Sequence, residues 1–182
     1  GLVVSDTDAR DVFVARNTDS EGSGGNVNYT QTGFVMTEGE GAYGVAMQSI
    51  GGGGGIVDNV FFGSAGGAGT AGDLFLSLAG SATVGGNNGI ALLAQSEARD
   101  GAGDIDFDVS GTVKAAGDFS TGVLGITRSS ANSGDLGIQV GGNAIASGTS
   151  AVGIDALLQG QFSVGEVVVG VVVVVVVGVV VG

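Results

Sequence analysis

Residues Gly103–Gly111 read GDIDFDVSG and show most clearly the strand pattern on which the fold of this chain depends. Its apolar residues Ile105, Phe107 and Val109 alternate with aspartates, and this period of two is typical of a β-strand with one buried face. The glycines at its ends favour turns, because glycine adopts backbone angles that other residues avoid. We therefore predict a short strand between two glycine turns, with the apolar side chains in the core and the aspartates in solvent.

This stretch is one copy of a repeat with a length of 31 residues. Gly-Asp followed by an apolar residue occurs at Gly72, Gly103 and Gly134, and a further glycine follows eight residues after each of these. A copy that begins at Gly25 has the same internal glycine spacing. Two further short alternating segments follow within each copy, so that each copy predicts three short strands.

Three strands per copy predict an all-β fold, namely a parallel β-helix (β-solenoid) with three short strands per coil of about 31 residues. A single coil cannot bury its apolar face, so successive coils must stack, with equivalent strands about 4.8 Å apart. We expect Leu74, Ile105 and Leu136 to form one column of neighbours, and Leu76 to lie beside Phe107. The small residues of the second and third strands predict a narrow interior.

The repeat divides the chain into three regions. We predict that residues 1–24 form an incomplete N-terminal coil and that residues 25–164 form the repeats, with an insertion at about 51–71. Residues 165–182 begin where a further coil is due, but after Glu166 they contain only valine and glycine. We interpret this tail as a placeholder for side chains that were not identified, and the alternative is a real membrane-spanning or aggregating segment. Because the chain does not start with methionine, we expect it to be a piece of a longer protein.

The charge and the missing residue types exclude several kinds of function. The chain has 18 Asp and Glu against 5 Lys and Arg, which gives a formal net charge of −13. Phosphate backbones repel such a chain, so we expect no nucleic-acid partner. Without His or Cys the chain lacks the residues for the usual catalytic triads, disulfides and thiolate metal sites. We predict no cofactor, with calcium as the one ion that the carboxylates could attract.

A motif in the third strand of the first complete copy resembles a known family. Residues 41–55 read GAYGVAMQSIGGGGG, which is similar to the repeat of bacterial autotransporter passenger domains, where a glycine-led strand ends in AQSIGGGGG. A weaker copy reads LLAQSEARDG, and the matching residues are Ala94, Gln95 and Ser96 against Met47, Gln48 and Ser49. The resemblance implies a secreted β-helix at the bacterial cell surface, often adhesive, held at the Gram-negative outer membrane through regions absent from this chain. It implies no shared catalytic residues.

One column of acidic residues is expected at a corner of the coil. Asp73, Asp104, Asp135 and Glu166 stand one repeat apart and would stack on one another. Carboxylates about 5 Å apart repel each other by roughly 0.8 kcal/mol per pair in water. The column is tolerated if each aspartate hydrogen-bonds its own turn, which is the role that we expect. The alternative is that the four residues bind calcium.

Asp104, Asp106 and Asp108 are the best candidates for catalysis, with Lys114 nearby in the sequence. Glycosidases use paired carboxylates, and carbohydrate-active enzymes do occur on β-helices. Strict alternation, however, predicts a solvated strand face, and we expect the neighbouring coils not to complete a carboxylate groove. We therefore predict no catalytic residues and no enzyme, and a carbohydrate-active passenger remains the alternative function.

The leading functional hypothesis is a secreted, cell-surface structural or adhesive β-solenoid that associates head to tail into filaments. Exposed strand edges at the ends of a solenoid invite another copy to pair with them. Phe61 and Phe62, within the insertion, would cap a coil of their own chain or contact a neighbouring subunit. A host or matrix receptor would be the partner of an adhesin, whereas a passive spacer stalk would need none.

Overall fold

The computed structural model of the chain describes residues 21–52, 55–57, 60–62, 68–159, 167–171 and 174–176. Within these ranges all regular secondary structure is β-strand, and the predicted all-β class is confirmed. The described residues accordingly include no helix with the length and apolar character needed to cross a membrane. Residues 1–20, Glu166 and the last residues of the Val-Gly tail lie outside the described residues.

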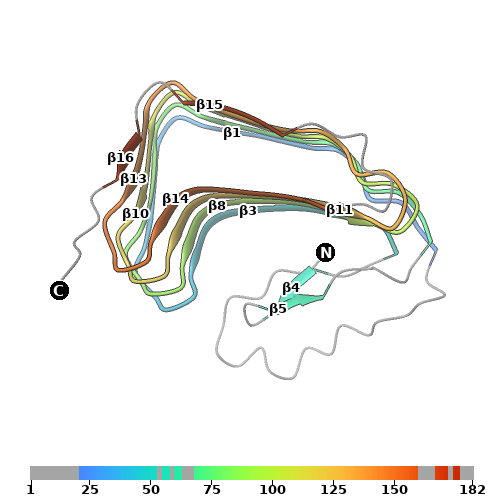
Figure 1. The fold of residues 1–182 in the computed structure, drawn as a ribbon, viewed down its shortest axis with the longest axis horizontal. Helices are drawn as coiled ribbons and strands as arrows, with labels where there is room; N and C mark the ends of the chain where they lie inside the picture. The colour runs from blue at the N-terminus through green and yellow to red at the C-terminus, as the bar shows by residue number, and fades with distance from the viewer. Residues whose placement is uncertain are drawn as a thin grey trace.

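Three parallel sheets form the walls of a solenoid-like structure (Figure 1). The first sheet contains, in spatial order, β1 (Val27–Gln31), β6 (Leu74–Leu78), β9 (Ile105–Val109), β12 (Leu136–Val140) and β15 (Val167–Val171). The second sheet contains β2 (Phe34–Thr37), β7 (Ser81–Val84), β10 (Thr112–Ala115), β13 (Asn143–Ala146) and β16 (Val174–Val176). The third sheet contains β3 (Tyr43–Ile50), β8 (Ile90–Ala98), β11 (Thr121–Ser129) and β14 (Val152–Gln159).

The chain visits the three sheets in turn, and we call one such passage a coil. Figure 1 looks along the stack, so that the strands of each sheet nearly overlay one another. Between β3 and β6 the chain adds an antiparallel hairpin, β4 (Gly55–Val57) and β5 (Val60–Phe62), inside the predicted insertion. β15 and β16 of the Val-Gly tail pair with β12 and β13, and thereby extend the first and second sheets.

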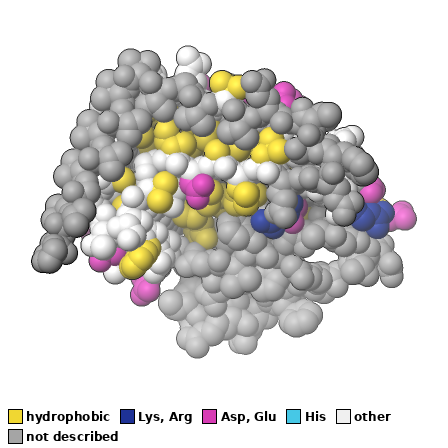
Figure 2. All heavy atoms as spheres, in the orientation of Figure 1, with side chains coloured by type: hydrophobic (Ala, Val, Ile, Leu, Met, Phe, Trp, Pro, Cys, Tyr) yellow, Lys and Arg dark blue, Asp and Glu magenta, His cyan; other side chains and the backbone are white. Residues whose placement is uncertain are grey.

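The predicted register between coils is confirmed. Leu74 pairs with Ile105, and Ile105 with Leu136, while Leu76 lies opposite Phe107. Every apolar side chain of β9 is buried and both of its aspartates are exposed, which agrees with the period-two pattern. The second sheet contributes small inward side chains, among them Ala82, Val113 and Ala144. Figure 2 shows the apolar side chains gathered inside the outline of the stack.

The role of the repeated glycines differs from the prediction. Gly80, Gly111 and Gly142 do not have positive φ angles; they stand directly over one another. A Cβ atom on Gly111 would overlap the carbonyl oxygen of Gly80, and one on Gly142 would overlap that of Gly111. These glycines are therefore required because the backbones of successive coils approach closely, and not because the turn needs an unusual backbone angle.

A left-handed backbone conformation, with positive φ, recurs at another corner, where only one of the four equivalent residues is a glycine. Gly41, Asn88, Phe119 and Ser150 occupy equivalent positions, with φ angles of 66°, 56°, 55° and 55°. This conformation is unfavourable for a residue with a side chain, and most of all for a bulky one such as Phe119. The stacking of the coils imposes the same backbone path on each copy, whichever residue stands there.

The strands of the third sheet are longer than predicted. β8 and β11 each have nine residues and continue through the Gln-Ser motif or its equivalent. All residues of β8 after Ile90 are buried, so both faces of this strand are covered. Leu93 and Ile126 form a second, small apolar cluster on the outer face of the sheet. Each coil therefore has the predicted three strands, but the strand on this side is longer than expected.

Candidate functional site

A groove of about 630 Å³ lies on the outer face of the first sheet. Its lining includes Phe75 from β6, Asp106 and Asp108 from β9, and Gly137 and Gln139 from β12. Alternation along each strand directs these residues outward, because their neighbours Leu76, Phe107 and Ile138 face the core.

Gly137 produces the hollow in this surface. Phe75, Asp106 and Gly137 are register neighbours, so they form one row across the sheet. Phe75 is 41% exposed, Gly137 has no side chain to fill its own position, and Val168 of β15, which is 53% exposed, continues the row beyond Gly137 and also lines the groove. A Cβ atom on Gly137 would lie 2.6 Å from Oδ1 of Asp106, which shows how closely this carboxylate leans over the gap.

The carboxylates around the groove affect one another. Partial burial raises the pKa of Asp106, and the negative charges of Asp104, Asp135 and Asp73 raise it further. The charged form of Asp106 is therefore disfavoured in the folded protein. The lining also includes Asp135, and it includes no lysine or arginine among the described residues.

The neighbouring coil adds one carboxylate, Asp135, to the two aspartates of β9, and the prediction of no catalytic residues stays a prediction. The structure brings Asp106, Asp108 and Asp135 to one hollow, because the strands of adjacent coils lie side by side. Lys114 is not part of it, since this residue lies on β10 in the second sheet. The feature of the sequence that points to the groove is Gly137, a glycine at an outward position inside a strand. The alternation pattern alone does not distinguish it from other outward residues.

The predicted acidic column lies at the edge of this surface, but its hydrogen bonds differ from the prediction. The N–H of Asp104 donates to Oδ1 of Asp73 at 3.0 Å, and the N–H of Asp135 donates to Oδ1 of Asp104 at 2.8 Å. In the same way the N–H of Asp73 donates to Oδ1 of Asn26 at 2.9 Å. The side chains of Asn26, Asp73 and Asp104 therefore bind the backbone of the next coil, and we call the column of Asp73, Asp104 and Asp135 the aspartate ladder.

The calcium hypothesis concerns the same residues. In the described part of the chain, no group of three or more acidic side chains is arranged to hold a metal ion. Glu166, the fourth candidate ligand, lies outside that part. One oxygen each of Asp73 and Asp104 already accepts a backbone hydrogen bond. Calcium binding at the column stays a prediction.

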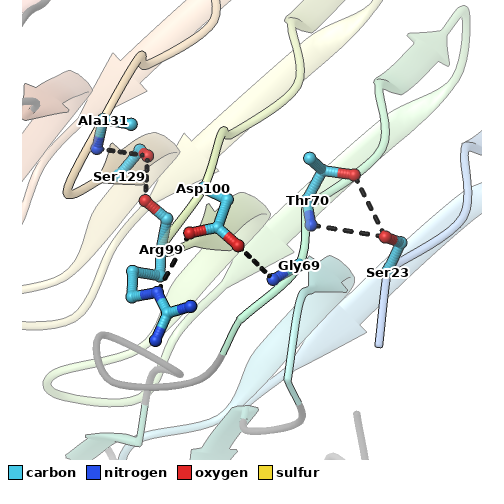
Figure 3. A network of polar contacts seen from close by, with 7 residues as sticks. All are labelled: Ser23, Gly69, Thr70, Arg99, Asp100, Ser129 and Ala131. Carbon is cyan, nitrogen blue, oxygen red and sulfur yellow. Dashed lines mark hydrogen bonds and ion pairs between the residues drawn. The ribbon is translucent and has the colours of Figure 1, made fainter. Parts of the chain in front are cut away.

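Polar side chains join the coils at other corners as well. Oδ1 of Asn87 accepts a hydrogen bond from the N–H of Asp118, and Oδ1 of Asp118 accepts one from the N–H of Thr149. Figure 3 shows a further set, in which Oδ2 of Asp100 accepts from the N–H of Gly69 in the preceding coil at 2.8 Å. The bonds from Arg99 and from Gly69 lower the pKa of Asp100. Most of these contacts repeat with the period of the coil.

The Gln-Ser motif also connects coils. Gln48 and Ser49 of β3 lie directly beside Gln95 and Ser96 of β8, so the alignment of the two motifs is confirmed. Nε2 of Gln48 donates to Oε1 of Gln95 at 2.8 Å. Oγ of Ser96 accepts from the N–H of Gly103 at 2.8 Å, as Oγ of Ser49 does from Gly72. The motif therefore has a structural role in binding the third strand to the following glycine corner.

Glu97 is a buried charged residue that the sequence analysis did not single out. Its side chain is 1% exposed, and its Oε2 accepts a hydrogen bond from Nε2 of Gln95 at 2.8 Å. Nη1 of Arg128 lies 3.7 Å from Oε1 of Glu97, which makes a loose ion pair on the outer face of the third sheet. The signal in the sequence was a glutamate inside the weaker copy of the motif, directly after Ser96.

The predicted interface residues lie in the insertion. Phe61 and Phe62 belong to β5, which pairs with β4. Their side chains lie outside the described part of the structure.

Comparisons of the chain with protein-family models, with curated proteins and with solved structures found no match.

Proposed function

We propose that the chain is a section of a parallel β-helix in a secreted, cell-surface protein, with a structural or adhesive function that depends on head-to-tail self-association. The observation that carries this proposal is the arrangement of sheet edges. β1, β2 and β3 each lie at the end of their sheet, so within the described residues none of these three strands has a strand partner on its other edge. Strands at such edges carry backbone groups that can pair with another chain.

The direction of these backbone groups follows from the register. The N–H of Val27 donates to the carbonyl oxygen of Asp73, and the carbonyl oxygen of Gln31 accepts from the N–H of Ala79. Alternate residues of a strand direct their backbone groups to opposite sides, so the N–H groups of Asn28 and Thr30 point away from β6.

The neighbouring strand β2 exposes large apolar side chains at the same end of the stack. Phe34 and Met36 on β2 are 82% and 58% exposed, whereas their register neighbours in the next coil are Ser81 and Thr83. Large exposed apolar side chains beside open strand edges favour association. Secretion to the cell surface is supported by the motif in residues 41–55 and its resemblance to passenger domains.

Edge pairing is tested by removing one N–H group. Thr30→Pro deletes a donor on the open side of β1 without removing a β1–β6 hydrogen bond, and Thr30→Ala is the matched control. We expect the parent and Thr30→Ala to form linear assemblies in negative-stain micrographs and light scattering, and Thr30→Pro to give shorter assemblies or monomers. A parent protein that stays monomeric at high concentration would refute self-association and leave a spacer stalk.

A further inference from the structure

The groove on the first sheet has features that the stacking of coils does not require. The outward residues of a strand need only tolerate solvent. Those that line this groove instead combine an aromatic ring, carboxylates, an amide and a glycine without a side chain. The backbone of β12 pairs with β9 in the same way at Gly137 as at its neighbours, so the pairing does not demand glycine there.

The negative charge of the groove indicates that its ligand is positively charged. Asp106 and Asp108 line it, and Asp135 and Gln139 complete the polar part of the lining. A cation close to Asp106 would relieve the repulsion that this carboxylate experiences from Asp104 and Asp73. The chain as a whole has a net charge of −13, which would also attract a cationic partner over longer distances.

The shape of the groove indicates how such a ligand would be seated. The partly exposed ring of Phe75 is the register neighbour of Asp106, so a cation between them would contact both an aromatic face and a carboxylate. Gly137 has no side chain, and Oδ1 of Asp106 lies 2.6 Å from where its Cβ would stand, so a flat or slender group that enters the hollow would meet this carboxylate. Arginine has both properties, because its guanidinium is planar, stacks on aromatic rings and binds carboxylates through two donors.

We propose that this groove binds an extended cationic peptide segment of a partner protein, with an arginine or lysine side chain seated between Phe75, Asp106 and Gly137. The site goes beyond the structural function proposed above and does not depend on self-association, because it lies on a sheet face and not at a strand edge.

The test uses the full chain and a fluorescently labelled oligo-arginine peptide, with binding followed by anisotropy. We expect saturable binding that weakens with salt. Asp106→Asn combined with Asp108→Asn should weaken it about tenfold, whereas Glu38→Gln combined with Glu40→Gln should change it less than about twofold. This control removes the same charge from exposed residues between β2 and β3.

A second variant separates shape from charge. Gly137→Val leaves the net charge unchanged, suits a β-strand, and fills the hollow by displacing the flexible end of Asp106. It should weaken peptide binding about tenfold. The Asp106→Asn variant should have a melting temperature no lower than that of the parent at neutral pH. The raised pKa of Asp106 means that folding disfavours its charged form, so removing this charge does not destabilise the protein.

Three outcomes would overturn the proposal. Equal weakening by the Glu38 and Glu40 control would show that only the overall charge attracts the peptide. Unchanged binding to Gly137→Val would show that the groove is not the site. Binding of a neutral oligosaccharide such as a chitin fragment at the groove, in the absence of peptide binding, would favour the carbohydrate-active alternative.

Discussion

At the scale of single residues, glycine determines how closely the coils approach one another. Gly142 has no room for a Cβ atom because the carbonyl oxygen of Gly111 occupies that space. Its neighbour Gly141 differs sharply, since the nearest atom to a Cβ placed there is 4.0 Å away. Two adjacent glycines in one turn therefore have different functions, although the sequence shows them as equivalent letters.

This difference gives a direct prediction. Gly142→Ala should destabilise the protein by about 1–3 kcal/mol, because the coils must separate to admit the methyl group. Gly141→Ala should change the free energy of unfolding by less than about 0.5 kcal/mol. Urea denaturation followed by circular dichroism measures both values. Equal effects of the two substitutions would contradict the close-stacking role of Gly142.

At the scale of elements, the corners between strands are held by side chains that accept backbone hydrogen bonds from the next coil. The aspartate ladder of Asp73, Asp104 and Asp135 is one example, and Asn87 with Asp118 is another. A carboxylate that accepts an N–H bond is stabilised, which offsets the repulsion between stacked aspartates. An amide oxygen does the same at Asn26 and Asn87 without any charge.

The ladder and the calcium hypothesis predict different responses. Asp104→Asn keeps the acceptor oxygen and should preserve or raise the melting temperature, whereas Asp104→Ala should cost about 1 kcal/mol. We expect a chelator to leave the melting temperature of the parent unchanged, as measured by a thermal scan. A clear decrease with chelator, together with destabilisation by Asp104→Asn, would instead favour a calcium site that needs the carboxylates.

At the scale of the whole molecule, stability comes from contacts between neighbouring coils. Phe107 is 2% exposed and has coils on both sides, with Leu76 and Ile138 as its register neighbours. Val35 packs only partly against the core from β2, at the end of the second sheet. In stacked repeats each unit is stabilised by its neighbours, so the middle coils contribute more than the end coils.

Two substitutions that shorten a core side chain compare the middle and the end of the stack. Phe107→Ala should destabilise the protein by about 3–5 kcal/mol, because it leaves a cavity that the rigid sheets cannot close. Val35→Ala should cost less than about 1.5 kcal/mol. Chemical denaturation gives both values. If the substitution in β2 were the more damaging one, stability would have to originate at the first coil.

The strands of the first sheet and the register between its coils follow from the sequence alone. Alternation at Ile105, Phe107 and Val109 identifies the buried face, and the repeat of 31 residues aligns this face with Leu74, Leu76 and Leu78 and with Leu136, Ile138 and Val140. These features are local or strictly periodic, so they are visible without coordinates.

Which outward residues become neighbours depends on the stacking of the coils and cannot be predicted from any single strand. The groove depends on Phe75, Asp106 and Gly137, which belong to three different coils and become neighbours only after stacking. The aspartate ladder and the burial of Glu97 likewise depend on backbone groups and on surfaces of other coils. The physical reason is that a strand's own sequence specifies its two faces, whereas the environment of the outer face is made by neighbouring segments of the chain.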